Sequence, residues 1–147
     1  MKASQAATGR VFVIRLEDGD KLPDAIEEFA GKKNMARGLC FLIGGMKGKS
    51  KVVVGPKNGE SMPVEPVVRE LSGVHETLAT GMLFPDDDGR PKLHMHAAFG
   101  RGENTTTGCI RLGVEVWQVA EVVLVEIRDN KACRKKDATT GLTLMQP

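Results

Sequence analysis

The segment from Leu93 to Phe99 constrains the fold more than any other stretch of this chain, because its apolar and polar residues alternate. Alternate residues of a β-strand project to opposite faces of the sheet. Leu93, Met95 and Phe99 therefore share one face, while His94 and His96 share the other, about 6 to 7 Å apart. The segment predicts a strand with one apolar face and one face that carries both imidazole rings.

Other runs rich in β-branched and apolar residues predict the remaining strands. The main runs are 10–16, 38–45, 51–55, 75–84 and 114–127. Asp88-Gly89 has the sequence of a hairpin turn and predicts that the strand ending at Phe84 pairs with the histidine strand. The run from Val114 to Ile127 is nearly all apolar, so we expect it to be buried on both faces.

One helix is predicted after the first strand. Apolar residues recur at helical spacing from Leu22 to Ala30, and charged residues occupy the opposite side. Such a helix presents a single apolar stripe, which fits against one face of a sheet.

Composition narrows the class of protein. The 147 residues are 41% hydrophobic and 27% charged, as in an ordinary soluble domain. Nowhere do about 20 apolar residues run together, so we expect no membrane segment and a cytoplasmic location. The three cysteines have no regular spacing, which argues against a disulfide framework. The net charge of +2 gives no strong electrostatic footprint for nucleic acid.

The ends of the chain differ from its middle. We expect residues 1–8 to be a disordered leader, residues 9–127 to form the folded domain and residues 128–147 to form a basic C-terminal tail. A basic run of this kind is most often a solvated terminus. It is also the part of the chain that could most easily make weak, sequence-independent contacts with DNA phosphates.

The histidines suggest a metal site. His94 and His96 on one face of a strand can bind the same ion, and His75 lies in a neighbouring strand-like segment that could bring a third ring to it. The alternative is that the rings line a subunit interface or a solvated sheet face. Glu121 lies inside an apolar run and needs a partner, either an arginine such as Arg111 or a ligating histidine that it supports.

In order and spacing, these elements resemble the plants-and-prokaryotes conserved (PPC) domain, in its stand-alone prokaryotic form. In land plants this domain accompanies AT-hooks in nuclear proteins. The resemblance covers about residues 9–127 and rests on Gly9–Leu16, Phe41–Gly45, Gly73–Gly81, His94–His96 and Gly108–Cys109. It implies an α+β fold, in which an antiparallel or mixed sheet packs against one main helix and a few short ones, and association into a homotrimer.

Two departures from the family pattern bear on function. Residues 73–78 lack the arginine and phenylalanine of the plant partner motif, so that contact surface is not implied. Prokaryotic members often have Gly-Gly-His after His-x-His, whereas here the second motif ends in Cys109. The predicted metal ligands are therefore His75, His94 and His96, with Cys109 either a fourth ligand or a buried apolar residue. Three imidazoles suit zinc first, then iron, nickel or copper.

Three functions stay open at this point. The first is a regulatory module that contacts DNA weakly and carries the metal site, as the resemblance implies. The second is a metal-dependent enzyme in which an open coordination position activates water, with Glu76 or Glu121 as proton acceptor. The third is a structural homotrimer without metal.

Overall fold

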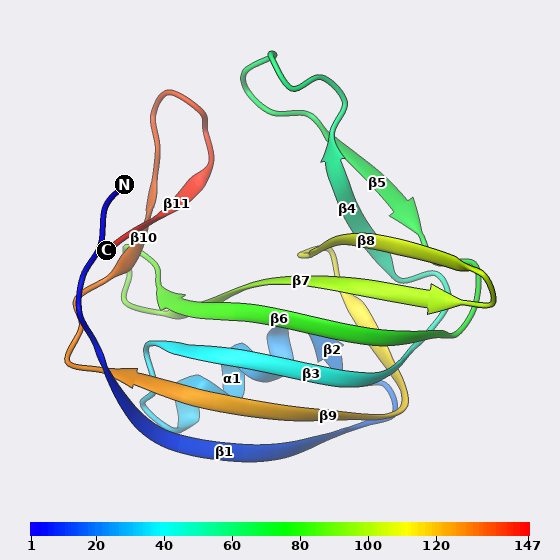
Figure 1. Ribbon diagram of the computed structural model, residues 1–147, viewed down its shortest axis with the longest axis horizontal. Coiled ribbons are helices and arrows are strands. Elements are labelled where there is room, and N and C mark those ends of the chain that lie inside the picture. Colours follow the sequence, from blue (N-terminus) through cyan, green and yellow to red (C-terminus); the bar gives the residue numbers. More distant parts are fainter.

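The computed structural model describes residues 1–147 and is dominated by one large antiparallel sheet (Figure 1). Its strand order is β1-β9-β3-β6-β7-β8-β4-β5, and β2 pairs with β9 beside this path. A separate hairpin joins β10 to β11. The strands are β1 (Ala7–Glu17), β2 (Lys21–Leu22), β3 (Gly38–Met46), β4 (Lys51–Pro56), β5 (Pro66–Glu70), β6 (His75–Pro85), β7 (Pro91–Arg101), β8 (Asn104–Ile110), β9 (Val114–Arg128), β10 (Cys133–Lys136) and β11 (Thr143–Gln146).

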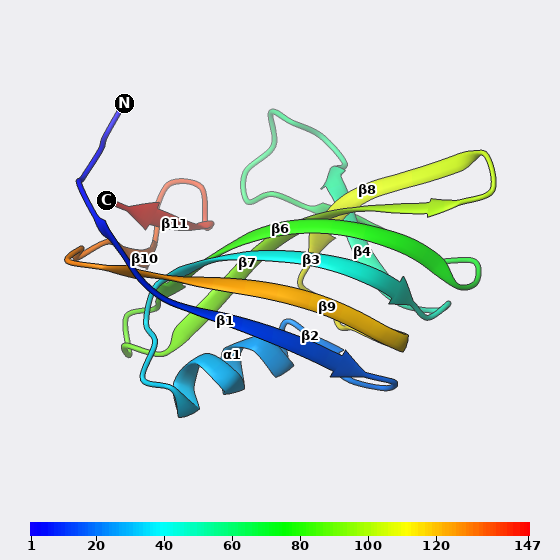
Figure 2. The same ribbon diagram turned by 60° about the horizontal axis from the view of Figure 1, so that its bottom comes forward.

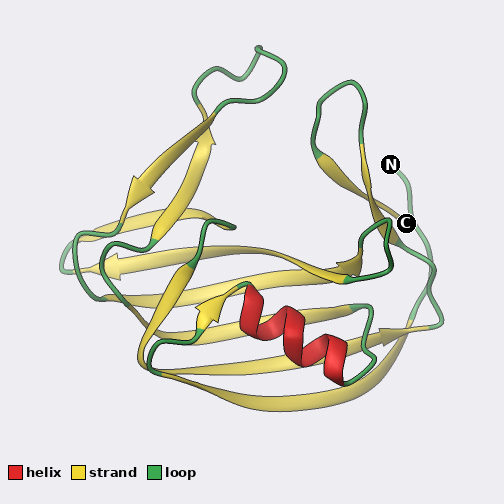
Figure 3. Cartoon of the chain, turned by 180° about the vertical axis from the view of Figure 1, so that it is seen from behind, coloured by secondary structure: helices red, strands yellow, loops and turns green.

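The helix α1 (Asp24–Lys32) covers one face of this sheet (Figures 2 and 3). Its buried residues Ile26 and Ala30 join a core that includes Leu83 and Met95 from the sheet. The sheet and single helix agree with the broad α+β prediction, but the additional short helices expected from the resemblance are absent. No helix in the structure has the length and apolar character that crossing a membrane requires.

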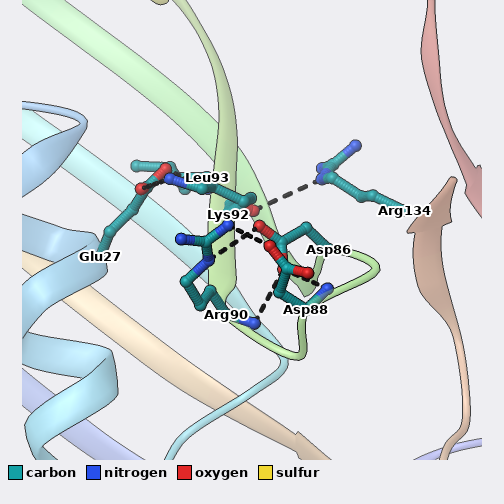
Figure 4. Close-up of polar contacts among 7 residues, drawn as sticks. All are labelled: Glu27, Asp86, Asp88, Arg90, Lys92, Leu93 and Arg134. Carbon is teal, nitrogen blue, oxygen red and sulfur yellow. Dashed lines mark hydrogen bonds and ion pairs between the residues drawn. The ribbon is translucent and has the colours of Figure 1, made fainter. Parts of the chain in front are cut away.

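A carboxylate fastens the helix to the histidine strand. Glu27 of α1 accepts hydrogen bonds from the backbone N–H of Leu93 at 2.9 Å and from Lys92 Nζ at 2.7 Å (Figure 4). These bonds hold the start of β7 against the helix, so they help to fix which face of the strand enters the core.

The alternation predicted for the histidine strand is confirmed. Leu93, Met95 and Phe99 are buried under the helix layer, whereas His94 and His96 are exposed on the opposite side of the sheet, which we call the outer face. The expectation that 114–127 is buried on both faces is wrong. Strand β9 alternates as well, with Val122 buried and its neighbour exposed, because no element of the chain covers the outer face over β9.

The outer face is unusually apolar. Large side chains that are more than a third exposed cover it from β1 to β6, namely Val11, Val13, Leu39, Phe41, Ile43, Leu78, Met82 and Val123. The register places Val13 beside Val123, and Val123 beside Phe41. A hollow of about 750 Å³ is lined by five of them, Val13, Phe41, Ile43, Leu78 and Val123, and also by His96. A folded monomer seldom exposes so continuous an apolar surface.

The C-terminal residues form the β10–β11 hairpin. Lys135 and Lys136 are exposed, but Arg134 is buried, with 7% of its surface accessible. At the other end of the chain, residues 1–6 have no regular structure and β1 begins at Ala7.

A bidentate ion pair links the beginning of β1 to the end of β9. Arg10 donates from Nε to Glu126 Oε2 at 2.8 Å and from Nη2 to Oε1 at 2.7 Å, and its backbone N–H also reaches Oε2. These hydrogen bonds lower the pKa of Glu126 to about 2. Gly9 leaves the space they need, because a Cβ there would lie 2.6 Å from Glu126 Oε2.

We expect Glu126→Gln to lower the free energy of unfolding by about 1–2 kcal/mol near neutral pH, because an amide cannot replace a carboxylate opposite a guanidinium. The pKa of Glu126 is lower in the folded state than its ordinary 4.5, so its stabilising effect is complete above that value and is lost as the pH falls towards about 2. Urea unfolding of both proteins across this range measures the difference. A difference that stays constant down to the lowest pH would contradict the assignment.

Candidate metal centre

Two histidines and one cysteine meet on the outer face. His94 and His96 project together from β7, and their Nε2 atoms lie 3.0 Å apart. Cys109 of β8 is the direct cross-strand partner of His96, so its side chain lies on the same face. The donor atoms of all three residues lie within 4.8 Å of one another. Strand alternation and antiparallel register are therefore sufficient to build the cluster.

The protonation of His94 suits a ligand. Its pKa is lowered to about 4, first by partial burial and then by the nearby charges of Arg134, His96 and Arg111. The ring is therefore neutral near physiological pH and keeps a nitrogen lone pair for a metal ion.

Arg111 lies directly beside the sulfur of Cys109. Its Nε and Nη2 donate to Sγ at 3.2 and 3.1 Å. Cysteine binds metals as a thiolate, and a thiolate here would have a guanidinium as its nearest charged partner. Cys109 is itself buried, which also agrees with the alternative interpretation of a small core residue.

The third histidine does not join the other two. His75 is buried on the helix-covered face, where its Nδ1 donates to the carbonyl oxygen of Gly73 at 2.8 Å. The β6 residue opposite His96 is Thr80, which follows His75 by five positions. At the rise of a β-strand, the two rings are separated by about 16 Å along the sheet as well as by its thickness. Within one chain, the expected three imidazoles are replaced by two imidazoles and a thiol.

The two glutamates singled out in the sequence also lie away from the cluster. Glu121 is exposed on β9, which is separated from β7 by β3 and β6. The predicted pair between Glu121 and Arg111 is wrong, because that guanidinium bonds to Cys109. Glu76 pairs in the register with Gly100, which follows His96 by four positions. That offset corresponds to about 13 Å along the strand.

Sequence reasoning missed Arg134, which comes from β10. Its guanidinium donates to the carbonyl oxygens of Met82 at 2.9 Å and Lys92 at 3.4 Å and lies 5.9 Å from the ring centre of Phe84. Figure 4 shows it reaching across to the start of β7. The only signal for this residue was the basic composition of the C-terminal segment.

The donor set fits a tetrahedral ion. Two imidazole nitrogens and a thiolate are common zinc ligands, and the donors lie about as close together as groups that share one ion. Three ligands from the protein leave the fourth position open to water or to a small molecule.

The protein is thus an α+β domain in which one helix covers one face of an open antiparallel sheet. The free face of the sheet carries the three candidate metal ligands. The chain belongs to the Plants and Prokaryotes Conserved (PCC) domain family, whose sequence profile matches residues 3–128.

Two solved structures resemble the whole chain closely. A metal-containing protein from Archaeoglobus fulgidus is 25% identical with a TM-score of 0.86, and the match covers 100% of both chains. A plant- and prokaryote-conserved protein from Pyrococcus horikoshii is 27% identical with a TM-score of 0.86, over 100% of this chain and 98% of the other.

A curated relative extends beyond this domain. The bifunctional protein GlmU from a Synechococcus strain is 26% identical over 133 residues, which make up 90% of this chain. The match spans only 19% of that relative, so most of the larger protein has no counterpart here.

Proposed function

We propose that this protein is a metal-binding regulatory module in which His94, His96 and Cys109 hold a divalent transition metal, zinc first. The proposal rests on one observation, the convergence of three donor atoms within 4.8 Å on an accessible face. The neutral state of His94 and the metal content of the Archaeoglobus fulgidus relative support it. His75 is left out of the ligand set because it faces the core.

A regulatory role is favoured over a catalytic one. A zinc-bound water becomes a useful nucleophile when a proton acceptor lies within hydrogen-bonding distance. Glu76 lies four positions along the sheet from His96, and Glu121 lies on a strand that two others separate from β7. Neither glutamate reaches the cluster, so the arrangement fits a structural or sensing metal better than a hydrolytic centre.

We also propose that the protein is a homotrimer whose copies cover the outer face. Its exposed apolar side chains form one continuous surface, and burying such a surface against a second copy is strongly favourable. Each copy would shield the hollow of its neighbour, and the third copy would close the ring. His96 is one of the residues that line the hollow, so this assembly would also exclude water near the metal ligands and strengthen the electrostatic interactions among them.

Weak DNA binding is a second candidate function, supported by a basic edge. Lys33 and Arg37 follow α1, and Arg128 and Lys131 lie at and beyond the end of β9. Hydrogen bonds hold these segments together, since Arg10 bonds to the carbonyl oxygen of Lys33 at 3.0 Å and Arg37 to that of Ala132 at 2.7 Å. The positive charge of this edge is suited to contacts with phosphates, but such contacts do not recognise the base sequence.

Elemental analysis of untagged protein tests the metal site. We expect one transition-metal ion per chain in the wild type and none in the His94→Ala, His96→Ala double variant. Cys109→Ser should retain less metal on dialysis, because a hydroxyl is a poorer zinc ligand than a thiolate. His75→Ala is the matched control, which should keep its metal while losing about 1–3 kcal/mol of stability. A wild-type protein free of metal would end the proposal.

Sedimentation velocity tests the assembly. Phe41→Glu places a charge at the middle of the outer face without touching the core, so we expect it to convert trimers into monomers. Leu142→Glu makes the same kind of change at an exposed leucine before β11 and should leave the trimer intact. Equal masses for the two variants would show that the outer face is not the interface.

A gel shift at two salt concentrations tests the basic edge. We expect duplex DNA to be retarded at about 50 mM salt and released by about 200 mM, because the contacts are with phosphates. Combining Lys33→Gln with Lys131→Gln should weaken the shift, whereas Lys51→Gln on β4 should not. No retardation at the lower salt concentration would remove DNA from the list of partners.

A further inference from the structure

We propose that the open position of the metal is filled by a small oxyanion, a carboxylate or a phosphate group, which Arg111 and Arg134 hold from two sides. This inference rests on the metal site proposed above and adds to it the chemical class of its ligand. It is carried by two guanidinium groups that flank the histidine pair without a carboxylate partner.

The burial of Arg134 without an ion-pair partner is the stronger of the two observations. Only 7% of its surface is accessible, yet it forms no ion pair, and its hydrogen bonds go to the carbonyl oxygens of Met82 and Lys92. A buried charge normally has a partner of opposite charge, because desolvation is costly. The nearby carboxylate of Glu27 is already bonded to Lys92 and to the backbone of Leu93 (Figure 4).

The register places this guanidinium beside the metal ligands. Met82, whose carbonyl oxygen accepts a hydrogen bond from Arg134, is the direct cross-strand partner of His94. Arg134 thus approaches the imidazole pair from the β6 side of β7. Its Nε and Nη2 make the two bonds to carbonyl oxygens, which leaves Nη1 for another acceptor.

Arg111 approaches from the β8 side. It follows Ile110, the partner of Met95, so it is level with His94 on the neighbouring strand. Its Nε and Nη2 point at Cys109 Sγ, which leaves its Nη1 for another acceptor as well. Two guanidinium groups therefore lie on opposite sides of one pair of imidazoles.

The charges of this site do not balance without an anion. A divalent ion and two guanidinium groups would face a single thiolate, and no carboxylate belongs to the cluster. A bound water would complete the coordination but leave the positive charge. A carboxylate or phosphate oxygen would supply the fourth ligand, and its remaining oxygens match the planar N–H donors of arginine.

Cobalt(II)-loaded full-length protein provides the test, because its visible absorption reports on the ligands of the ion. Acetate and inorganic phosphate are titrated separately at constant ionic strength. We expect at least one of them to change the spectrum in a saturable way, and the comparison identifies which oxyanion is preferred. Arg134→Gln should weaken that response about tenfold or more, and Arg111→Gln should also weaken it.

Lys135→Gln is the matched control, since it removes one positive charge from an exposed neighbour of Arg134 on the same hairpin. It should titrate like the wild type. Cobalt content and circular dichroism verify that each variant is folded and loaded, and Arg134→Lys separates loss of charge from loss of the planar donor group.

The outcomes separate the two proposals. If cobalt binds but neither oxyanion changes the spectrum, or if both arginine variants titrate like Lys135→Gln, the oxyanion inference is overturned and the metal site stands. If the protein takes up no cobalt, the metal site fails and the oxyanion inference fails with it. A saturable response that depends on the two arginines and not on Lys135 supports both.

Discussion

The period-two alternation of β7 is the constraint on which the rest of the structure depends. One helix covers one face of the sheet, so each side chain of β7 lies either in the core or on the outer face. A register slip of one residue would drive His94 and His96 into the core and expose Met95. The bonds from Glu27 to the start of β7 oppose such a slip. Core packing and the position of the candidate metal ligands are therefore fixed by the same alternation.

Much of this organisation could be predicted from the sequence, because it depends on local patterns. Alternation identified the two faces of β7, the helical spacing located α1, and Asp88-Gly89 marked the hairpin between β6 and β7. The family resemblance pointed to Cys109, and the structure brings it to the histidine pair. These features need only the positions of residues along a strand and the pairing of neighbouring strands.

Predictions from the sequence failed where the position of a side chain depended on what covers a face of the sheet or on contacts between distant segments. His75 was expected near the other histidines because its strand is adjacent, but its position along β6 gives it the opposite face. Glu121 was expected to be buried because its neighbours are apolar, yet the face on which it lies is uncovered. Arg134 comes from a hairpin outside the large sheet, and no local pattern indicates that its guanidinium reaches Met82.

As a ligand of the proposed metal site, Cys109 would change the electrostatics of the site as well as its ligand set. An imidazole binds a metal without altering the net charge, whereas a thiolate subtracts one unit and favours softer ions. A buried thiolate is costly unless positive charge lies close to it, and Arg111 offers two N–H donors to the sulfur. In the proposed metal site, Arg111 would therefore accommodate the negative charge that a Cys109 thiolate introduces.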